Sequence, residues 1–241
     1  MEVRKETAIR FAGVNKRYGT RPALRNLHLE VPARLTFGLV GANGAGKTTL
    51  IKCMLDFCGF DNGEIEVFGE PSTNTAARRR LAFLPERFVP PYFLTGEDFL
   101  RLMMRMYGRD YEPQAATSTL GALNLAGDAL ARPVRAFSKG MTQKLGLAAC
   151  LMSGRDLLVL DEPTSGLDPR ARALLKKHLR QLHAQGATVF LTSHALADVE
   201  ELCDQMAVLH EGEVLYVGAP AALKERYDAA TLEDAYLECI A

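Results

Sequence analysis

The sequence predicts an α/β fold in which helices flank a mostly parallel sheet, with an antiparallel β portion and an inserted helical subdomain. Strand-like apolar runs alternate with helical patterns over much of the chain, and this alternation is typical of parallel sheets. Strand patterns are missing between about residues 88 and 152, where helical patterns take over. The 241 residues, 48% of them hydrophobic, suffice for one packed domain of this architecture.

The first part of the chain combines short strands with one glycine-rich loop. Alternating segments near residues 8–14 and 23–31 predict antiparallel strands beside the main sheet. The apolar run LTFGLV (35–40) predicts a buried strand, and a helix is expected from Lys47 to about Phe57. A hairpin is expected in EIEVFGE (64–70). The glycine-rich loop therefore lies between a buried strand and a helix.

The middle of the chain predicts helices and then a return to strand. Thr95 with Asp98 fits a capping box that opens a helix through Tyr107. The run LLVLD (157–161) predicts a second buried strand. These elements place the helical segment between two strands of the main sheet.

The second half alternates again between helix and strand. Asp168 and Pro169 resemble the N-cap and first-turn residues of a helix that Gly186 ends. The run ATVFLTS (187–193) predicts a further strand, followed by a short helix at about 196–203. A hairpin about Glu211-Gly212 and one or two short helices complete the chain.

A single domain in three parts is expected. Residues 1–87 and 153–210 form the α/β core, residues 88–152 form the helical subdomain, and residues 211–241 form a hairpin and short helices.

The segment GANGAGKTT (Gly41 to Thr49) matches the phosphate-binding pattern G-x-x-x-x-G-K-[ST]. Its glycines let successive backbone N–H groups converge on phosphate oxygens, and the following helix points its positive end at the same anion. Lys47 is expected to reach the β- and γ-phosphates, and Thr48 to place its hydroxyl on Mg²⁺. The buried strand before the loop disfavours the alternative, a glycine-rich turn without function. The nucleotide-binding residues expected here are Gly41, Asn43, Gly44, Ala45, Gly46, Lys47, Thr48 and Thr49.

Two carboxylates follow the strand LLVLD, at the kind of strand end where α/β sheets bind ligands. Asp161 is expected to bind Mg²⁺ through water, and Glu162 to take a proton from an attacking water. The alternative is a pair of acids that cap a loop, and the presence of the phosphate loop disfavours it. To this point the residues indicate a phosphate-loop NTPase.

The segment PVRAFSKGMTQKLGLA (133–148) resembles the signature segment of ATP-binding-cassette (ABC) ATPases, usually written LSGGQ. It keeps the serine (Ser138) and the second glycine (Gly140) but has Lys139 and Met141 where the family usually has glycine and glutamine. The resemblance implies that Ser138 and Gly140 face the γ-phosphate bound by a partner protomer. Each ATP would then be sandwiched across a dimer.

The resemblance covers nearly the whole chain. It implies that Tyr18 stacks on adenine, that Asp168 in SGLD helps to join two protomers, and that His194 in LTSH contacts the γ-phosphate. The alternatives are a core aromatic for Tyr18 and an ordinary packed or solvated residue for His194. Where the family usually has a glutamine, LAFLPE carries Glu86, a substitution familiar from ATPases of bacterial drug, lipid or polysaccharide exporters. Glu86 is expected to bind Mg²⁺ or to orient water.

The resemblance implies an ATPase subunit of a membrane exporter, with ATP and Mg²⁺ as its cofactors. Its expected partners are a second copy or a related ATPase, and a separate transmembrane permease. No segment approaches the roughly 18 apolar residues that span a bilayer, and MEVRKETAIR has no apolar signal core. The expected location is therefore the cytoplasm, at the inner face of the cell membrane. The aromatic segment RFVPPYFLTG (87–96) either receives a helix of the membrane subunit or packs the helical insert.

Two other functions remain open. The first is a soluble ABC ATPase that acts on nucleic acid or the ribosome, but 29 basic residues balance 29 acidic ones, and direct nucleic-acid binding is not expected. The second is a nucleotide-gated clamp with little turnover, which Glu86, Lys139 and Met141 keep open. The cysteines lack zinc spacing and are interpreted as reduced thiols: Cys53, Cys58, Cys150, Cys203 and Cys239.

Overall fold

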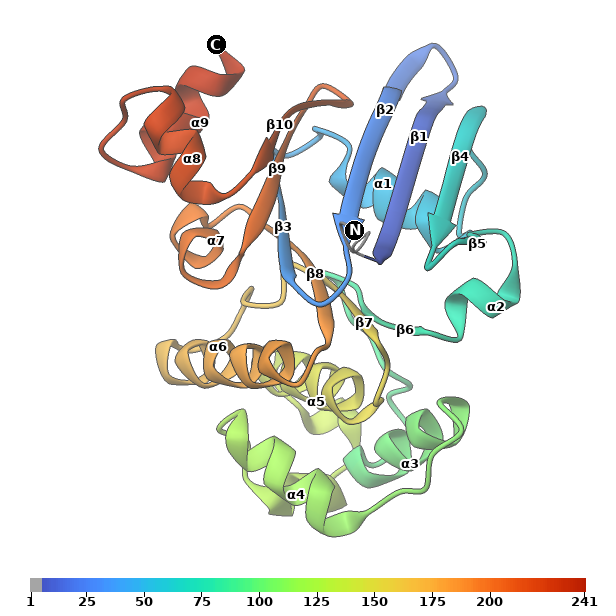
Figure 1. The fold of residues 1–241 in the computed structure, drawn as a ribbon. Helices are drawn as coiled ribbons and strands as arrows, with labels where there is room; N and C mark the ends of the chain where they lie inside the picture. Colours follow the sequence, from blue (N-terminus) through green and yellow to red (C-terminus); the bar gives the residue numbers. More distant parts are fainter. Residues whose placement is uncertain (1–5) are drawn as a thin grey trace.

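The computed structural model describes residues 6–241, which form two sheets and the helices that cover them (Figure 1). Residues 1–5 lie outside the described residues. They begin both the stretch MEVRKETAIR and the predicted core segment 1–87. The antiparallel sheet has the strand order β2-β1-β4-β5. Its strands are β1 (Thr7–Tyr18), β2 (Arg21–Pro32), β4 (Asn62–Val67) and β5 (Glu70–Pro71).

The second sheet has the order β10-β9-β3-β8-β7-β6 and is parallel except for β10. The carboxyl ends of β3, β7 and β8 therefore meet along one edge, and the segments that follow them carry the predicted site residues. Its strands are β3 (Thr36–Val40), β6 (Leu81–Leu84), β7 (Leu157–Asp161), β8 (Thr188–Ser193), β9 (Gln205–His210) and β10 (Glu213–Gly218).

Helix α1 packs on one face of this sheet, close to the antiparallel sheet (Figure 1). Helices α3, α4, α5, α8 and α9 pack on the other face, where α3, α4 and α5 gather at the end opposite α8 and α9. None of the helices between residues 6 and 241 combines the length and the apolar character needed to cross a membrane. The helices are α1 (Lys47–Met54), α2 (Thr75–Arg78), α3 (Gly96–Met106), α4 (Pro113–Ala122), α5 (Lys139–Met152), α6 (Pro169–Ala184), α7 (Leu196–Leu202), α8 (Pro220–Arg226) and α9 (Leu232–Ile240), with short 3-10 turns at Gly127–Ala131 and Val134–Ala136.

The core has two parts because alternate side chains of a strand point to opposite faces. On β7, Leu157 and Val159 pack with α1 and the antiparallel sheet, whereas Leu158 and Leu160 pack with the helices of the other face. All four side chains are buried, as expected for a parallel strand covered on both sides. The fold thus has three layers, with the parallel sheet in the middle.

The predicted fold class is confirmed, and most predicted elements form. Thr95 and Asp98 make the capping box at α3. The Thr95 hydroxyl accepts the N–H of Asp98 at 3.1 Å, and the Asp98 carboxylate accepts the N–H of Thr95 at 3.3 Å. Helices α3, α4 and α5 occupy the range predicted to be helical. The division of the chain into core, helical subdomain and C-terminal part stays a prediction.

Helix α1 is shorter than predicted. It ends at Met54 instead of about Phe57, because Asp56 adopts a left-handed conformation (φ 60°). The backbone N–H groups of Phe57 and Cys58 then turn back to the carbonyl of Lys52, at 2.8 and 3.4 Å. This is the backbone reversal that often ends helices, here without the usual glycine.

The β9–β10 hairpin connects the phosphate loop to the antiparallel sheet. Its two turn residues, Glu211 and Gly212, both have positive φ (46° and 85°), as the tight two-residue hairpin turn requires. The N–H of Gly212 donates to the Ala45 carbonyl, and the Gly212 carbonyl accepts from the Arg25 N–H, both at 2.9 Å. A C-terminal element thereby holds two N-terminal ones together.

Candidate functional site

The phosphate loop begins where β3 ends and leads into α1. Gly46 has φ 115°, and a Cβ on it would lie 2.7 Å from the carbonyl oxygen of Ala23. Gly41 is not in the left-handed region, but a Cβ on it would lie 2.3 Å from the carbonyl oxygen of Leu209. The loop backbone lies so close to β2 and β9 that neither position can carry a side chain, and both therefore require glycine.

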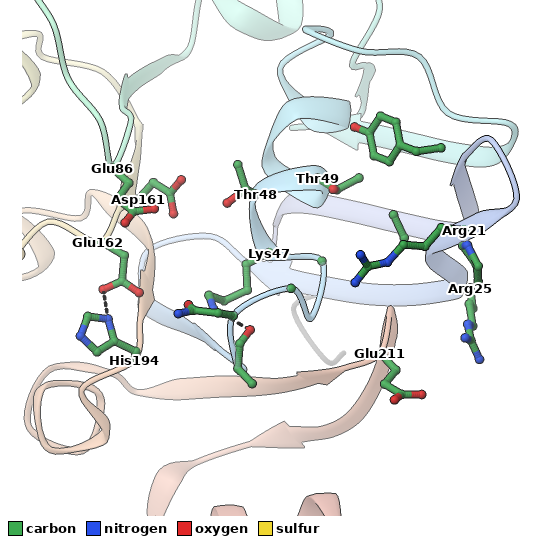
Figure 2. Close-up of a pocket in the computed structure, with 17 residues that line it drawn as sticks. Arg21, Arg25, Lys47, Thr48, Thr49, Glu86, Asp161, Glu162, His194 and Glu211 are labelled. Carbon is green, nitrogen blue, oxygen red and sulfur yellow. Dashed lines mark hydrogen bonds and ion pairs between the residues drawn. The ribbon is translucent and has the colours of Figure 1, made fainter.

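A cavity of about 660 Å³ opens over this loop (Figure 2). Glu86, Asp161, Glu162 and His194 lie at one end, Arg21 and Arg25 at the other, and Lys47 between them (Figure 2). The lining residues are Tyr18, Arg21, Pro22, Ala23, Arg25, Ala42, Asn43, Gly44, Gly46, Lys47, Thr48, Thr49, Glu86, Asp161, Glu162, His194 and Glu211. Within the loop, Gly41 and Ala45 are buried and do not line the cavity.

Lys47 is the buried cation of the cavity. Its Nζ donates to the backbone carbonyls of Gly41 at 2.5 Å and Ala42 at 3.3 Å. Burial lowers the pKa of Lys47, and the negative charges of Glu162 and Asp161 partly oppose that effect. The ammonium group is thus held within reach of both the loop backbone and the carboxylates.

Asp161 is the last residue of β7, and its position depends on the neighbouring strand. Its register partner on β8 is Thr192, whose hydroxyl donates to Asp161 Oδ1 at 2.6 Å. The same hydroxyl oxygen accepts the backbone N–H of Glu162 at 2.9 Å. Burial raises the pKa of Asp161, the hydrogen bond from Thr192 opposes this, and the charge of Glu86 raises it further.

Glu162 is buried and has a left-handed backbone (φ 50°), which turns its side chain into the cavity. His194, on the loop after β8, has its Nδ1 2.8 Å from Glu162 Oε2 (Figure 2). The two side chains form an ion pair when the imidazole is protonated, and among the described residues Glu162 Oε2 is a buried acceptor without a hydrogen bond. An unsatisfied buried carboxylate oxygen is suited to accept a hydrogen bond from a bound water.

Glu86 and Tyr18 reach the cavity from different sheets. Glu86 is exposed and follows β6, the strand next to β7. Tyr18 ends β1 and is 52% exposed, with the Lys16 ammonium 5.2 Å from its ring centroid. The hydroxyl of Tyr18 lies 3.7 Å from Cys58 Sγ. This exposure does not fit the alternative that Tyr18 is a core aromatic, whereas it leaves the ring accessible for stacking.

The structure does not bring Ser138, Gly140 or Asp168 to this cavity. Ser138 caps α5, accepting the Met141 N–H at 3.2 Å, as its sequence position predicts. Asp168 caps α6, accepting the Ala171 N–H at 2.8 Å. It also accepts from the buried Lys144 ammonium at 2.9 Å, and this contact lowers the pKa of Asp168. Within one copy, these residues therefore form a separate surface.

Thr192 and Arg21 are site residues that sequence reasoning missed. Thr192 looks like an ordinary strand residue, and only the pairing of β7 with β8 shows its contact with Asp161. Arg21 starts β2 and points over the phosphate loop (Figure 2). Its Nη2 lies 3.8 Å from the position of a Cβ on Gly44, whereas Arg25 approaches Glu213 at 3.9 Å. An arginine three residues after the tyrosine predicted to stack on adenine was the available signal.

The residues fit a nucleotide triphosphate with Mg²⁺. The close-packed glycines leave a backbone cradle, and Lys47 and Arg21 supply positive charge along it. Thr48 and Asp161 supply a hydroxyl and a carboxylate, and Mg²⁺ is usually held by one or two carboxylates together with waters and substrate phosphates. The donor set therefore suits the metal.

Comparison with known proteins gives consistent results. A family model described as "ABC transporter" matches residues 24–165. The Nod factor export ATP-binding protein I of Burkholderia orbicola (strain AU 1054) is 40% identical over 224 residues, which cover 90% of this chain and 72% of that protein. A solved structure described as the ATP-binding subunit of an ABC transporter is 29% identical, has a TM-score of 0.86, and is matched over 96% of this chain and 99% of that one.

A second solved structure shares the fold at lower identity. It is a dimeric ATP-binding cassette in a post-hydrolysis state, bound to ADP and Pi. It is 19% identical, with a TM-score of 0.79, and the match covers 88% of this chain and 98% of that one.

Proposed function

This chain belongs to the ABC transporter family as an ATP-binding ATPase subunit, and we propose that it powers a membrane exporter through the cavity over its phosphate loop. The observation that carries the proposal is the arrangement of Lys47, Asp161 and Glu162 around one cavity at the carboxyl ends of β3 and β7. The export direction is supported by the relative named for Nod factor export.

The phosphate loop binds the triphosphate. Backbone N–H groups of residues 43–48 and the start of α1 surround the phosphates, and Lys47 neutralises charge on the β- and γ-phosphates. Arg21 extends the positive charge toward the nucleoside end, where the exposed ring of Tyr18 stacks on adenine. The cavity thus orients the nucleotide with its γ-phosphate toward the carboxylates.

Glu162 is the general base in this proposal. Its unsatisfied buried oxygen accepts a proton from the water that attacks the γ-phosphate, and His194 beside it contacts the same phosphate. Thr192 keeps both carboxylates in position from β8. Thr48, Asp161 and Glu86 would hold Mg²⁺, which, when bound, neutralises phosphate charge during hydrolysis.

A dimer completes the site. Ser138 and Gly140 at the start of α5, and Asp168 at the start of α6, lie outside the cavity of their own copy. In a head-to-tail pair, the positive end of α5 would face the γ-phosphate bound by the partner. The cassette of the same fold that is described as dimeric and bound to ADP and Pi supports a dimer. The partner is a second copy or a related ATPase.

A groove beside the signature segment is proposed to receive the transmembrane permease. It has a volume of about 600 Å³ and is lined by residues of the aromatic segment, including Phe88, Val89 and Tyr92, and by Phe137. Val89 and Tyr92 are 77% and 69% exposed, and Glu86 lies at both this groove and the nucleotide cavity. A helix seated there would link membrane movement to the catalytic site. It would also hold the protein at the inner face of the membrane.

The test is co-purification of the tagged protein from detergent-solubilised native membranes. We expect a stoichiometric partner with several transmembrane helices, and we expect Tyr92→Asp to lose that partner. Leu237→Asp is the matched control, because Leu237 is comparably exposed at 60% but lies on α9, away from the groove. Recovery of only soluble proteins or ribosomes would instead favour a soluble ABC ATPase.

A further inference from the structure

Two cysteines lie in contact next to the nucleotide cavity. Cys53 is on the last turn of α1, Cys58 follows the end of this helix, and their sulfur atoms are 3.6 Å apart. Cys58 Sγ is also the atom that lies 3.7 Å from the Tyr18 hydroxyl. The three side chains therefore form a row from the helix core to the cavity, which we call the dithiol row (Cys53, Cys58, Tyr18).

The backbone holds the two cysteines together. The left-handed Asp56 reverses the chain, and the N–H of Cys58 returns to the carbonyl of Lys52, the residue before Cys53. A disulfide has a sulfur–sulfur distance of about 2.0 Å, so the sulfur atoms need to approach by only about 1.6 Å. Cys58 is half-buried and lies after the end of α1, so we expect its side chain to make this movement.

The two thiols differ in environment. Cys53 is 1% exposed, and burial together with the contact to Cys58 raises its pKa to about 12. Cys58 is half-buried and accessible from the surface. Because Cys58 is the accessible thiol, it meets an oxidant first, and the buried Cys53, whose sulfur is in contact with it, resolves the product.

We propose that Cys53 and Cys58 are a redox modification site, which hydroperoxides convert to an intramolecular disulfide. The Cys58 thiolate attacks the O–O bond of hydrogen peroxide, giving a sulfenic acid and hydroxide, which takes up a proton to form water. The Cys53 sulfur then attacks the Cys58 sulfur, the S–O bond breaks, and the leaving hydroxide takes the Cys53 proton as a second water. Two thiols lose two electrons and one peroxide gains them.

The modification would act on the nucleotide cavity through Tyr18. The disulfide moves Cys58 Sγ toward Cys53 and away from the Tyr18 hydroxyl, which loses its contact with that sulfur. The same helix carries Lys47, Thr48 and Thr49 at its other end. This consequence rests on the proposed function, in which Tyr18 stacks on adenine, whereas the modification itself does not.

The test uses the intact protein, hydrogen peroxide and mass spectrometry. Trypsin cleavage after Lys52 and Arg78 releases both cysteines in one peptide. After oxidation and alkylation of the remaining thiols, we expect this peptide to lack alkyl groups and to weigh two hydrogens less than the reduced peptide. Cys53→Ala and Cys58→Ser should prevent this product. Cys239→Ser, which changes the other half-buried cysteine, should not. Full alkylation of both cysteines, or over-oxidation of Cys58 without a disulfide, would overturn the proposal.

Titration with a fluorescent ATP analogue tests the link to the cavity. Oxidation should raise the Kd at least about fivefold, which is about 1 kcal/mol, in the wild type and not in Cys58→Ser. A disulfide that leaves the Kd unchanged would contradict the link through Tyr18. If the reduced protein fails to bind the analogue, the proposed function fails, while the peptide mass still decides on the modification site.

Discussion

Thr192 joins the two carboxylates of the site to the neighbouring strand. Its hydroxyl donates to Asp161 Oδ1 at 2.6 Å, and the same oxygen accepts the N–H of Glu162 at 2.9 Å. The side chain is fully buried, so these partners are not exchanged for water. One hydroxyl on β8 therefore sets the direction of the proposed metal ligand and of the proposed general base.

Thr192→Val keeps the shape of the side chain but removes both contacts. A hydrogen bond to a charged group contributes about 1.5–3 kcal/mol, so we expect ATPase activity to fall about 10- to 100-fold. The matched control is Thr188→Val on the same strand, where a buried hydroxyl accepts the N–H of Arg34 far from the cavity. Steady-state phosphate release measures both variants. An equal loss in both would mean that the effect is one of stability.

Glu162→Gln removes the proposed general base while keeping the size of the side chain. Turnover is expected to fall about 10²- to 10⁴-fold, whereas ATP binding is retained. ATP should therefore stay bound and hold the protein as a dimer, which size-exclusion chromatography with ATP detects. Turnover at the wild-type rate would exclude Glu162 as the base.

Glu86→Gln removes one negative charge near Asp161. In the wild type, the charge of Glu86 helps to raise the pKa of Asp161. If Glu86 helps to hold Mg²⁺, more of the ion will be needed for half-maximal ATPase activity. The control is Glu64→Gln, an exposed carboxylate on β4. A Mg²⁺ titration of the ATPase rate distinguishes the variants. Unchanged activity and Mg²⁺ dependence would remove Glu86 from the site.

Arg21→Ala removes positive charge above the phosphate loop. Arg21 is exposed, so its contribution is modest, and we expect the Kd for ATP to rise about fivefold, or about 1 kcal/mol. Arg10→Ala is the control, because Arg10 forms ion pairs with Glu64 and Glu66 on the antiparallel sheet instead. Fluorescence titration with an ATP analogue gives both constants. Equal affinities would show that Arg21 does not contact the nucleotide.

Asp168→Asn tests the contact with Lys144 through its pH dependence. Because the pKa of Asp168 is lower in the folded protein than its ordinary value of 3.8, its charged form stabilises the fold above that pH. The variant should therefore melt at a lower temperature than the wild type at neutral pH. The difference should shrink as the pH falls below 3.8 and disappear once the pH has passed the lower pKa of Asp168 in the folded protein.

Thermal melts at neutral and acidic pH measure this difference. The control is Glu97→Gln, which removes an exposed ion pair to Arg101 and should have little effect, since exposed pairs contribute little. Lys144 is buried and keeps the Asn124 carbonyl as a partner, but Asp168→Asn removes the negative charge beside its ammonium group. A pH-independent difference would contradict the role of the charge.

Local patterns predicted the fold and the order of the motifs because each depends on neighbouring residues. The phosphate loop, the strand before Asp161 and the caps at Ser138 and Asp168 are all of this kind. Thr192 could not be found in the same way, since its contact with Asp161 depends on the register between β7 and β8. Register is set by the packing of the whole sheet.

The cysteines show the same limit from another side. Spacing predicted reduced thiols without a zinc pattern, and this stays a prediction, but the contact between Cys53 and Cys58 depends on where α1 ends. That end is set by a left-handed Asp56, which is an uncommon conformation for a residue other than glycine. The sequence predicted that the helix continues to about Phe57, and in that case Cys58 would occupy a different position relative to Cys53.

The contacts of Gly212 restrict where the protein can be engineered. Because this residue bonds to both Ala45 and Arg25, a tag or peptide inserted at the β9–β10 turn would pull on the phosphate loop directly, although the turn is distant from it in sequence. The linkers at residues 108–112 and 227–231 make no such backbone bonds to the loop and are better insertion points at their exposed residues, away from the partly buried Tyr111, Tyr227 and Ala229. For this family member, a biosensor or affinity label belongs there, while the hairpin length must stay fixed.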